Sequence, residues 1–274
     1  MEKVRGFPTI AVNTVTYLPY SLDEALEGIR GAGFQWVEIA SIPGVCQHIP
    51  LDMDDSASRA LKKKLASLGL KLCSLSSHTD LTSKEGSRLA MQAIGLASRL
   101  GVSIVNTAVG GPSNKNEDES LFLENIPEIA SYARQESVVL ALEIHGKLTG
   151  TGRKSLDLVR KVNHPNVKIN YDTGNCLYFA DTAPYEDLME ALPEVAHVHL
   201  KDKIGGKGVW NFPPIGTGEI DFRRILDLLS ASNFSGPMSI EIEFTEKGWP
   251  SLPEVNEAVV VAFRNLSRLL NIAG

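Results

Sequence analysis

The chain has 274 residues, of which 43% are apolar and 22% are charged, and these proportions are ordinary for a globular protein rather than a disordered one. No window holds the roughly 18 apolar residues that would span a bilayer. The 27 basic and 33 acidic residues give a net charge of −6, which disfavours nucleic acid as a partner because surfaces that bind it are usually basic.

The start of the chain and the cysteines bear on location. "MEKVRGFPTIAV" has charges but no apolar stretch before a small-residue cleavage site, so neither a secretory signal nor a membrane anchor is expected. Cys46, Cys73 and Cys176 form no close pair and leave an odd one over, which argues against a disulfide framework and a cysteine zinc site. A reducing, cytoplasmic location is the expectation.

The first half of the chain alternates between short β-rich runs and longer runs with helical spacing. Ser21 and Glu24 stand at capping-box spacing, which predicts that a helix begins there. Strands are expected at 8–15, 36–40, 71–76 and 102–109, and helices at 21–33, 55–68, 84–99 and 119–135.

The second half repeats the alternation. Asp221 can cap a helix that starts directly after it. Strands are expected at 138–145, 167–172, 195–201 and 238–244, and helices at 154–162, 184–192, 221–232 and 253–270.

Eight strands that are each followed by a helix predict an α/β protein with a single (β/α)₈ (TIM) barrel domain over residues 1–274. A doubly wound open sheet is the main competitor. Its nucleotide-binding forms should show a glycine fingerprint after an early strand, whereas the turn after the first expected strand is "TYLPYS". No linker or low-complexity segment divides the chain.

Active sites of such barrels lie at the carboxyl ends of the strands. The last four expected strands end near Glu143, Asp172, His199 and either Glu241 or Glu243. Each residue alone could cap a turn or fill the core, but three carboxylates at one barrel mouth are costly unless a cation neutralises them. Oxygen-rich ligands with one imidazole indicate one divalent ion such as Mn²⁺, Mg²⁺ or Co²⁺.

Two of these positions have a competitor on the same strand face. Alternation places His197 beside His199 and Glu243 beside Glu241. His199 is favoured because it is nearer its strand end. By the same criterion Glu243 is nearer its own strand end, so the residues alone leave the choice between the two glutamates open.

The motifs "LALEIHG", "NYDTGN", "HVHLKD" and "PPIGTGEIDF…GPMSIEIE" resemble, in order, the xylose isomerase-like barrels, which include sugar isomerases, hexulose 3-epimerases, inosose dehydratase and endonuclease IV. "GFQWVEIA" resembles the second strand of the same superfamily. The resemblance implies that Glu143, Asp172, His199 and Glu241 hold one metal, and that the two glutamates act as acid and base. It thereby favours Glu241 over Glu243.

The expected function is that of a metal-dependent sugar or polyol isomerase or epimerase. Glu143 and Glu241 would transfer protons through a metal-stabilised enediolate. Two alternatives stay open: an inosose-type dehydratase on the same metal site, and a sugar-binding barrel without catalysis.

Some residues of this chain differ from the pattern of the family, and these differences bear on which branch it resembles. The hexulose 3-epimerase branch usually has a histidine where this chain has Asn175 and an arginine where it has Gly205, and Lys201 could replace that arginine as a cation. The endonuclease branch needs more zinc ligands, among them a histidine in the loop after the seventh strand. That loop, "KDKIGGKGVWNFPP", has no histidine, so a site with three zinc ions is not expected.

Weaker candidates for substrate binding are expected around Glu143, Asp172, His199 and Glu241. His78 and Asn106 are expected at the right level to meet substrate hydroxyls, Glu38 is expected at the end of the second strand, and His145 shares a strand face with Glu143. Asn175 and Lys201 complete the expected substrate-binding residues.

The loop after the seventh strand adds two expectations. "GTGEID" at 216–221 is read as a turn and a helix cap, because its acidic side chains would repel phosphate, and this favours an unphosphorylated polyol. Trp210 and Phe212 could cover the apolar face of a sugar or only pack. Barrels of this kind often associate as dimers or tetramers, so a homo-oligomer is a further expectation.

Overall fold

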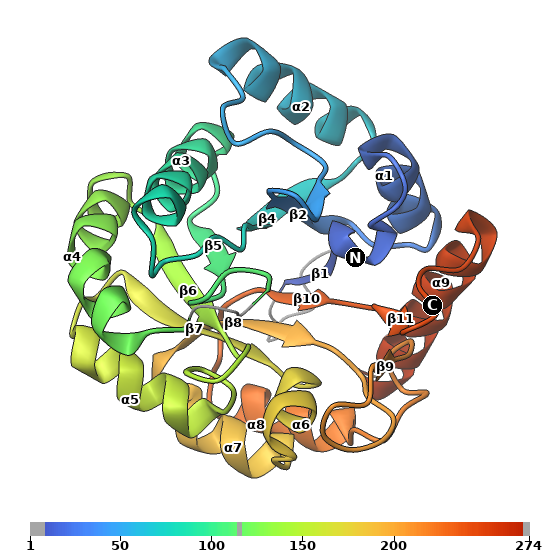
Figure 1. The fold of residues 1–274 in the computed structure, drawn as a ribbon. Helices are drawn as coiled ribbons and strands as arrows, with labels where there is room; N and C mark the ends of the chain where they lie inside the picture. Colours follow the sequence, from blue (N-terminus) through green and yellow to red (C-terminus); the bar gives the residue numbers. More distant parts are fainter. Residues whose placement is uncertain (1–8, 114–116, 271–274) are drawn as a thin grey trace.

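Eight parallel strands close into a barrel in the residues that the computed structural model describes, 9–113 and 117–270 (Figure 1). The first strand pairs with both its sequence neighbour and the last barrel strand, and this closes the ring and confirms the predicted barrel. In chain order the strands are β1 (Ile10–Asn13), β2 (Trp36–Ile42), β4 (Lys71–Ser76), β5 (Ile104–Thr107), β6 (Val139–Glu143), β7 (Val167–Asp172), β8 (Val195–Leu200) and β10 (Met238–Ile240).

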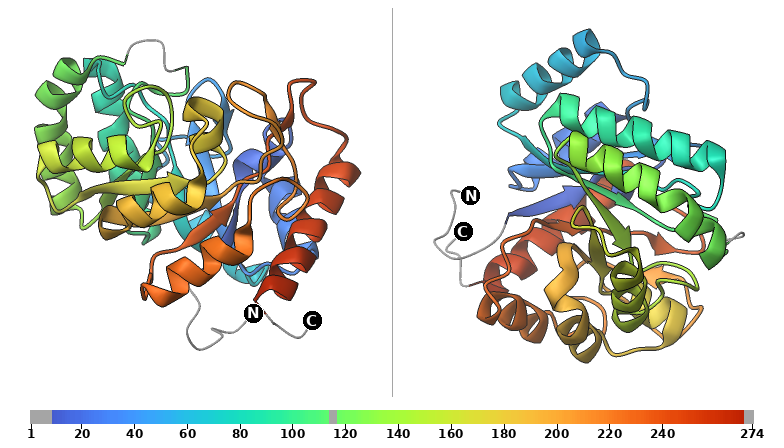
Figure 2. Two further views of the ribbon diagram at one scale, coloured as in Figure 1. Left: turned by 90° about the horizontal axis from the view of Figure 1, so that it is seen from below. Right: turned by 90° about the vertical axis from the view of Figure 1, so that its left-hand side faces the viewer.

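Helices surround the strands, as the two further views in Figure 2 show. They are α1 (Leu22–Gly31), α2 (Asp55–Ser67), α3 (Lys84–Leu100), α4 (Glu119–Gln135), α5 (Gly152–Val162), α7 (Pro184–Ala191), α8 (Phe222–Ala231) and α9 (Leu252–Leu269). Ser21 and Glu24 form the predicted capping box of α1, and Asp221 caps α8. None of the described helices has the length and apolar content needed to cross a membrane.

Several expected strands are shorter in the structure. β1 ends at Asn13, whose side chain accepts a hydrogen bond from Val15 N and starts the 3-10 helix η1 (Thr14–Tyr17). β10 ends at Ile240, four residues before the predicted end of 238–244. Residue 8 of the first expected strand, and residues 114–116 of the loop before α4, lie outside the described residues.

Small elements that the sequence did not predict lie in the connections between the barrel strands and the helices. β3 (Cys46–Gln47) folds back on β2, and β9 (Asn211–Phe212) pairs with β11 (Phe244–Thr245). The short helix α6 (Asn175–Ala180) follows β7, and the 3-10 helix η2 (Leu192–Glu194) precedes β8. β2 also continues past Glu38 to Ile42, so Glu38 lies within the strand and not at its end.

The layer between strands and helices is apolar, whereas the barrel interior carries polar side chains. Buried Leu, Ile, Val and Ala residues from most helices and strands form one large hydrophobic cluster. Inside the barrel Glu38, Asn106, Asn170, His197 and His199 are all at most 1% exposed. Such interiors are usually filled by branched apolar residues, so this polar core indicates a functional requirement.

The contact between α1 and the last helix tests how closely the ring of helices is packed. Tyr17 Oη donates to Asn256 Oδ1 at 2.9 Å, and a Cβ atom at Gly28 would collide with both groups. We expect Gly28→Ala to lower the free energy of unfolding by about 1–3 kcal/mol, because overpacking outweighs the better helix propensity of alanine.

Gly31→Ala in the same helix is the matched control, because its new Cβ would meet nothing within 4 Å. Its stability should equal that of the wild type or exceed it by up to about 1 kcal/mol. Equal effects of the two substitutions in urea unfolding would contradict the packing argument.

Candidate functional site

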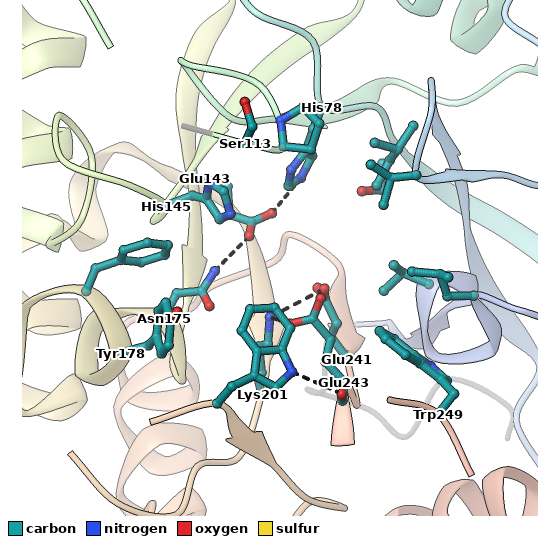
Figure 3. A pocket seen from close by; sticks show the side chains of 18 residues that line it. His78, Ser113, Glu143, His145, Asn175, Tyr178, Lys201, Glu241, Glu243 and Trp249 are labelled. Carbon is teal, nitrogen blue, oxygen red and sulfur yellow. Dashed lines mark hydrogen bonds and ion pairs between the residues drawn. The ribbon is translucent and has the colours of Figure 1, made fainter. Parts of the chain in front are cut away.

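A cavity of about 540 Å³ opens at the carboxyl ends of the barrel strands. Figure 3 shows the side chains that line it, with His78, Glu143, His145 and Asn175 on one side and Trp249 on another. The polar lining residues are Ser76, His78, Ser113, Glu143, His145, Asn175, Lys201, Glu241 and Glu243. The cavity is large enough for a small sugar.

Four predicted residues meet beneath this cavity. Glu143, Asp172, His199 and Glu241 are buried, and each offers one ligand atom within 4.8 Å of the others. Nδ1 of His199 is the centre of the group, because it lies 2.9 Å from a Glu241 oxygen and 3.2 Å from a Glu143 oxygen. An oxygen of Asp172 lies 3.8 Å from the same nitrogen.

The turn after β7 fixes the carboxylate of Asp172. Its Oδ1 accepts hydrogen bonds from the backbone N–H groups of Gly174 and Asn175, at 2.9 Å and 2.8 Å. Its Oδ2 is buried and has no hydrogen-bond partner. Burial raises the pKa of Asp172. One oxygen therefore holds the turn, and the other is left facing the group.

One carboxylate oxygen of Glu241 also lacks a hydrogen-bond partner. This oxygen, Oε2, is buried and lies 2.9 Å from Nδ1 of His199 in an ion-pair contact. Buried carboxylate oxygens without a hydrogen-bond partner are rare and costly, and a metal ion is one way to satisfy them. Three carboxylates and one imidazole nitrogen are a donor set that fits a divalent ion of the Mg²⁺ or Mn²⁺ type.

The carboxylate of Glu143 is oriented from three sides. Asn175 Nδ2 donates to its Oε1 at 3.0 Å, while His78 Nε2 and Asn170 Nδ2 lie 3.1 Å and 3.3 Å from its Oε2. Burial by itself would raise the pKa of Glu143, but His78 and His199 hold it well below its usual range. Glu143 is thus an ionised carboxylate in a fixed position.

Lys201 lies among the carboxylates of Asp172, Glu241 and Glu243. Its Nζ forms an ion pair with Glu243, and lies 3.5 Å from Glu241 Oε1 and 3.8 Å from Asp172 Oδ2. It also stands 4.5 Å from the ring centre of Phe212. Although burial opposes its charge, Glu241 and Glu243 raise the pKa of Lys201 well above its usual value. Glu243 therefore pairs with Lys201, and Glu241 joins the four-residue group.

Glu38 supports the site from below. Nε2 of His199 lies 3.2 Å and 3.3 Å from the two Glu38 oxygens, and Asn106 Nδ2 donates to Glu38 Oε1 at 2.7 Å. Nε2 of His197 lies 3.4 Å from the same carboxylate. Burial would raise the pKa of Glu38, but His199 and His197 lower it to about 2. This carboxylate keeps Nδ1 of His199 turned toward the acidic group.

The predicted substrate-binding residues divide into two sets. His78, His145, Asn175 and Lys201 line the cavity. Asn106 does not line it and is 0% exposed, and its Nδ2 donates a hydrogen bond to Glu38 Oε1. His145 packs edge-on against His78 at 5.5 Å between ring centres. Burial lowers the pKa of His145 to about 3.

Aromatic residues that sequence reasoning missed complete the lining. Tyr178 and Phe179 come from the short helix α6, and Trp249 comes from the loop after β11. Trp210 lines the cavity as expected, but Phe212 is 0% exposed and packs beneath Lys201. The pair of rings in "CLYFAD" was the available signal, but six residues are too few to predict a helix from periodicity.

Comparison with known proteins agrees with this fold. Residues 26–259 match the model of the family described as the xylose isomerase-like TIM barrel, and the chain belongs to this family. An L-ribulose-5-phosphate 3-epimerase from Salmonella typhi is 26% identical over 233 residues, which cover 80% of this chain and 81% of that protein.

Two solved structures extend the comparison. The structure of an L-ribulose 3-epimerase matches with a TM-score of 0.77 at 21% identity, covering 97% of this chain and 95% of that one. A xylose isomerase-like TIM barrel protein from Mycobacterium smegmatis in complex with magnesium matches with a TM-score of 0.73 at 20% identity, covering 96% and 98%. At these identities the structural matches establish the fold.

The support beneath His199 can be tested in the metal-free protein. We expect Glu38→Gln to lower the free energy of unfolding by about 3–5 kcal/mol, because it removes one partner of a fully buried charged group. Glu27→Gln, at an exposed position of α1, should stay within about 0.5 kcal/mol of the wild type. A loss below about 1 kcal/mol for Glu38→Gln in urea unfolding would contradict the role assigned to Glu38.

Proposed function

We propose that the protein is a divalent-metal-dependent isomerase or epimerase of a sugar or polyol. One observation carries the proposal: the acidic group around Nδ1 of His199 contains two buried oxygens without hydrogen-bond partners, on Asp172 and Glu241. The names of the similar proteins, 3-epimerases of L-ribulose and of its 5-phosphate, support a ketose as substrate.

The ion would be held by Glu143, Asp172, His199 and Glu241, and Mn²⁺, Mg²⁺ or Co²⁺ suit these ligands. When bound, it would supply electrostatic stabilisation for the negative charge that a ketose acquires when the carbon next to its carbonyl loses a proton. The similar barrel that was solved with magnesium supports an ion of this class.

Proton transfer would fall to the two glutamates. Glu143 stands at the end of β6 and Glu241 directly follows β10, so their carboxylates reach the cavity from separate parts of the barrel wall (Figure 3). One would remove the proton and the other would return a proton to the opposite face of the carbon. Removal of the proton from one face and return of a proton to the other would invert a carbinol centre, which is an epimerisation.

Neighbouring side chains would prepare these two groups. Asn175 and His78 hold the Glu143 carboxylate by its two separate oxygens, so its position does not depend on the substrate. Lys201 reaches the cavity beside Glu241 and would donate hydrogen bonds to a substrate oxygen. Trp210 and Trp249 line the same cavity and would limit the access of water.

The test compares Glu143→Gln and Glu241→Gln with the wild type. Each variant, saturated with Mn²⁺ and with bound metal measured, should lose epimerisation by about 10²–10⁴-fold, and the variant without the base that removes the proton should lose exchange between ketose and deuterated water by the same factor, because amides cannot transfer the proton.

Glu246→Gln, at an exposed position of the loop after β11, is the control and should keep full exchange. Full exchange by both active-site variants would end the proposal. If the loss of exchange is fully explained by the loss of bound Mn²⁺, the two glutamates act as metal ligands and the acid–base role is contradicted.

A further inference from the structure

The loop after the seventh barrel strand, which helps to bind phosphate in many barrels, here binds a side chain of this protein. Such barrels often hold a phosphate with the loops after the seventh and eighth strands and a helix start. Here the loop after the seventh strand, β8, wraps around Asp202. Its Oδ2 accepts hydrogen bonds from Gly216 N and Gly218 N, both at 2.8 Å.

The other oxygen of Asp202 completes the arrangement. Oδ1 accepts from Lys203 N at 2.8 Å and from Ile220 N at 3.3 Å, so one buried carboxylate takes four backbone N–H groups. Converging backbone N–H groups of this kind are an anion site. An internal carboxylate already occupies it, and the α8 start beyond it is capped by Asp221.

The cavity offers little positive charge to a second anion. Among its described lining residues Lys201 is the lysine, no arginine lines it, and His78 already lies 3.1 Å from an oxygen of Glu143. Lys201 already contacts Glu241, Glu243 and Asp172. The loop after the eighth strand, β10, contributes the glutamates at 241 and 243, so a phosphate dianion would meet acidic groups there.

One wall of the cavity is apolar. Val15 and Leu18 follow β1, and Ile42 and Val45 form the turn between β2 and β3. Trp249, which also lines the cavity, donates from Nε1 to the backbone oxygen of Thr16 at 2.8 Å. Val15 and Ile42 belong to a small hydrophobic cluster that is separate from the main core, with Leu18 packed against it. This wall suits carbon atoms and not a charged group.

We propose that the cavity selects an unphosphorylated ketose, with its reacting carbons at the acidic floor and its remaining carbons against the apolar wall. The inference rests on the proposed function. It separates this protein from the similar L-ribulose-5-phosphate 3-epimerase, whose name specifies a phosphorylated substrate.

The experiment measures kcat/KM for deuterium exchange on L-ribulose and on L-ribulose 5-phosphate, with the Mn²⁺-loaded protein. The wild type should favour L-ribulose by at least about tenfold, the effect of roughly 1.4 kcal/mol. Exchange that is equal or faster with the phosphate would overturn this inference and leave the proposed function standing. Exchange with neither sugar would overturn the inference for this ketose pair. Exchange measured on a panel of other keto-sugars would then decide the proposed function.

A charge placed on the apolar wall gives a second test. Val45 is 46% exposed and lines the cavity, so Val45→Lys should fold and should raise kcat/KM for the phosphate by about three- to tenfold. Val209→Lys is the matched control, because Val209 is 47% exposed and is not among the lining residues. An equal gain in both variants, or no gain in Val45→Lys, would contradict the proposed position of the substrate.

Discussion

The arrangement of carboxylates around His199 is the constraint on which the rest of the structure depends. Its imidazole is 0% exposed and lies within 4 Å of oxygens from Glu38, Glu143, Asp172 and Glu241. Removing such charges from water is expensive unless they are paired. The two ring nitrogens divide the task, because Nε2 faces Glu38 and Nδ1 faces the other three carboxylates.

This division determines what the surrounding chain must do. Strand β2 supplies Glu38 from 161 residues away, so the second and seventh strands of the barrel are linked through one histidine. The turn after β7 binds one oxygen of Asp172 and leaves the other free for the site. Lys201 offsets part of the negative charge. A divalent ion would supply the rest, which is why the site and the proposed chemistry depend on the same residues.

The sequence predicted the barrel and the members of the acidic group because both depend on local signals. Helix caps and strand runs mark each unit, and Glu143 and Asp172 stand at strand ends that can be located from the sequence. The choice between Glu241 and Glu243 needed the resemblance or the structure. Alternation along a strand could not decide it, because β10 ends at Ile240 and the side-chain directions beyond it depend on the partners available there.

Contacts between distant segments could not be predicted. Asn106 was expected to meet the substrate and Glu38 to end the second strand, but they meet each other under the cavity, and only the closed barrel brings their strands to the same level. The apolar wall comes from η1 and the turn before β3, short elements without a periodic signal. In the proposed position of the substrate these parts of the cavity would contact its far end, so the segments that bear most on the identity of the substrate are those that the sequence did not reveal.

The most direct measurement incubates the Mn²⁺-loaded protein with a panel of keto-sugars and inososes in deuterated water and scores the products by mass. The account predicts that at least one unphosphorylated ketose gains a deuterium at the carbon next to its carbonyl without losing water. Loss of water would instead identify a dehydratase. The absence of label from every ketose, with metal bound, would contradict the proposed proton transfer.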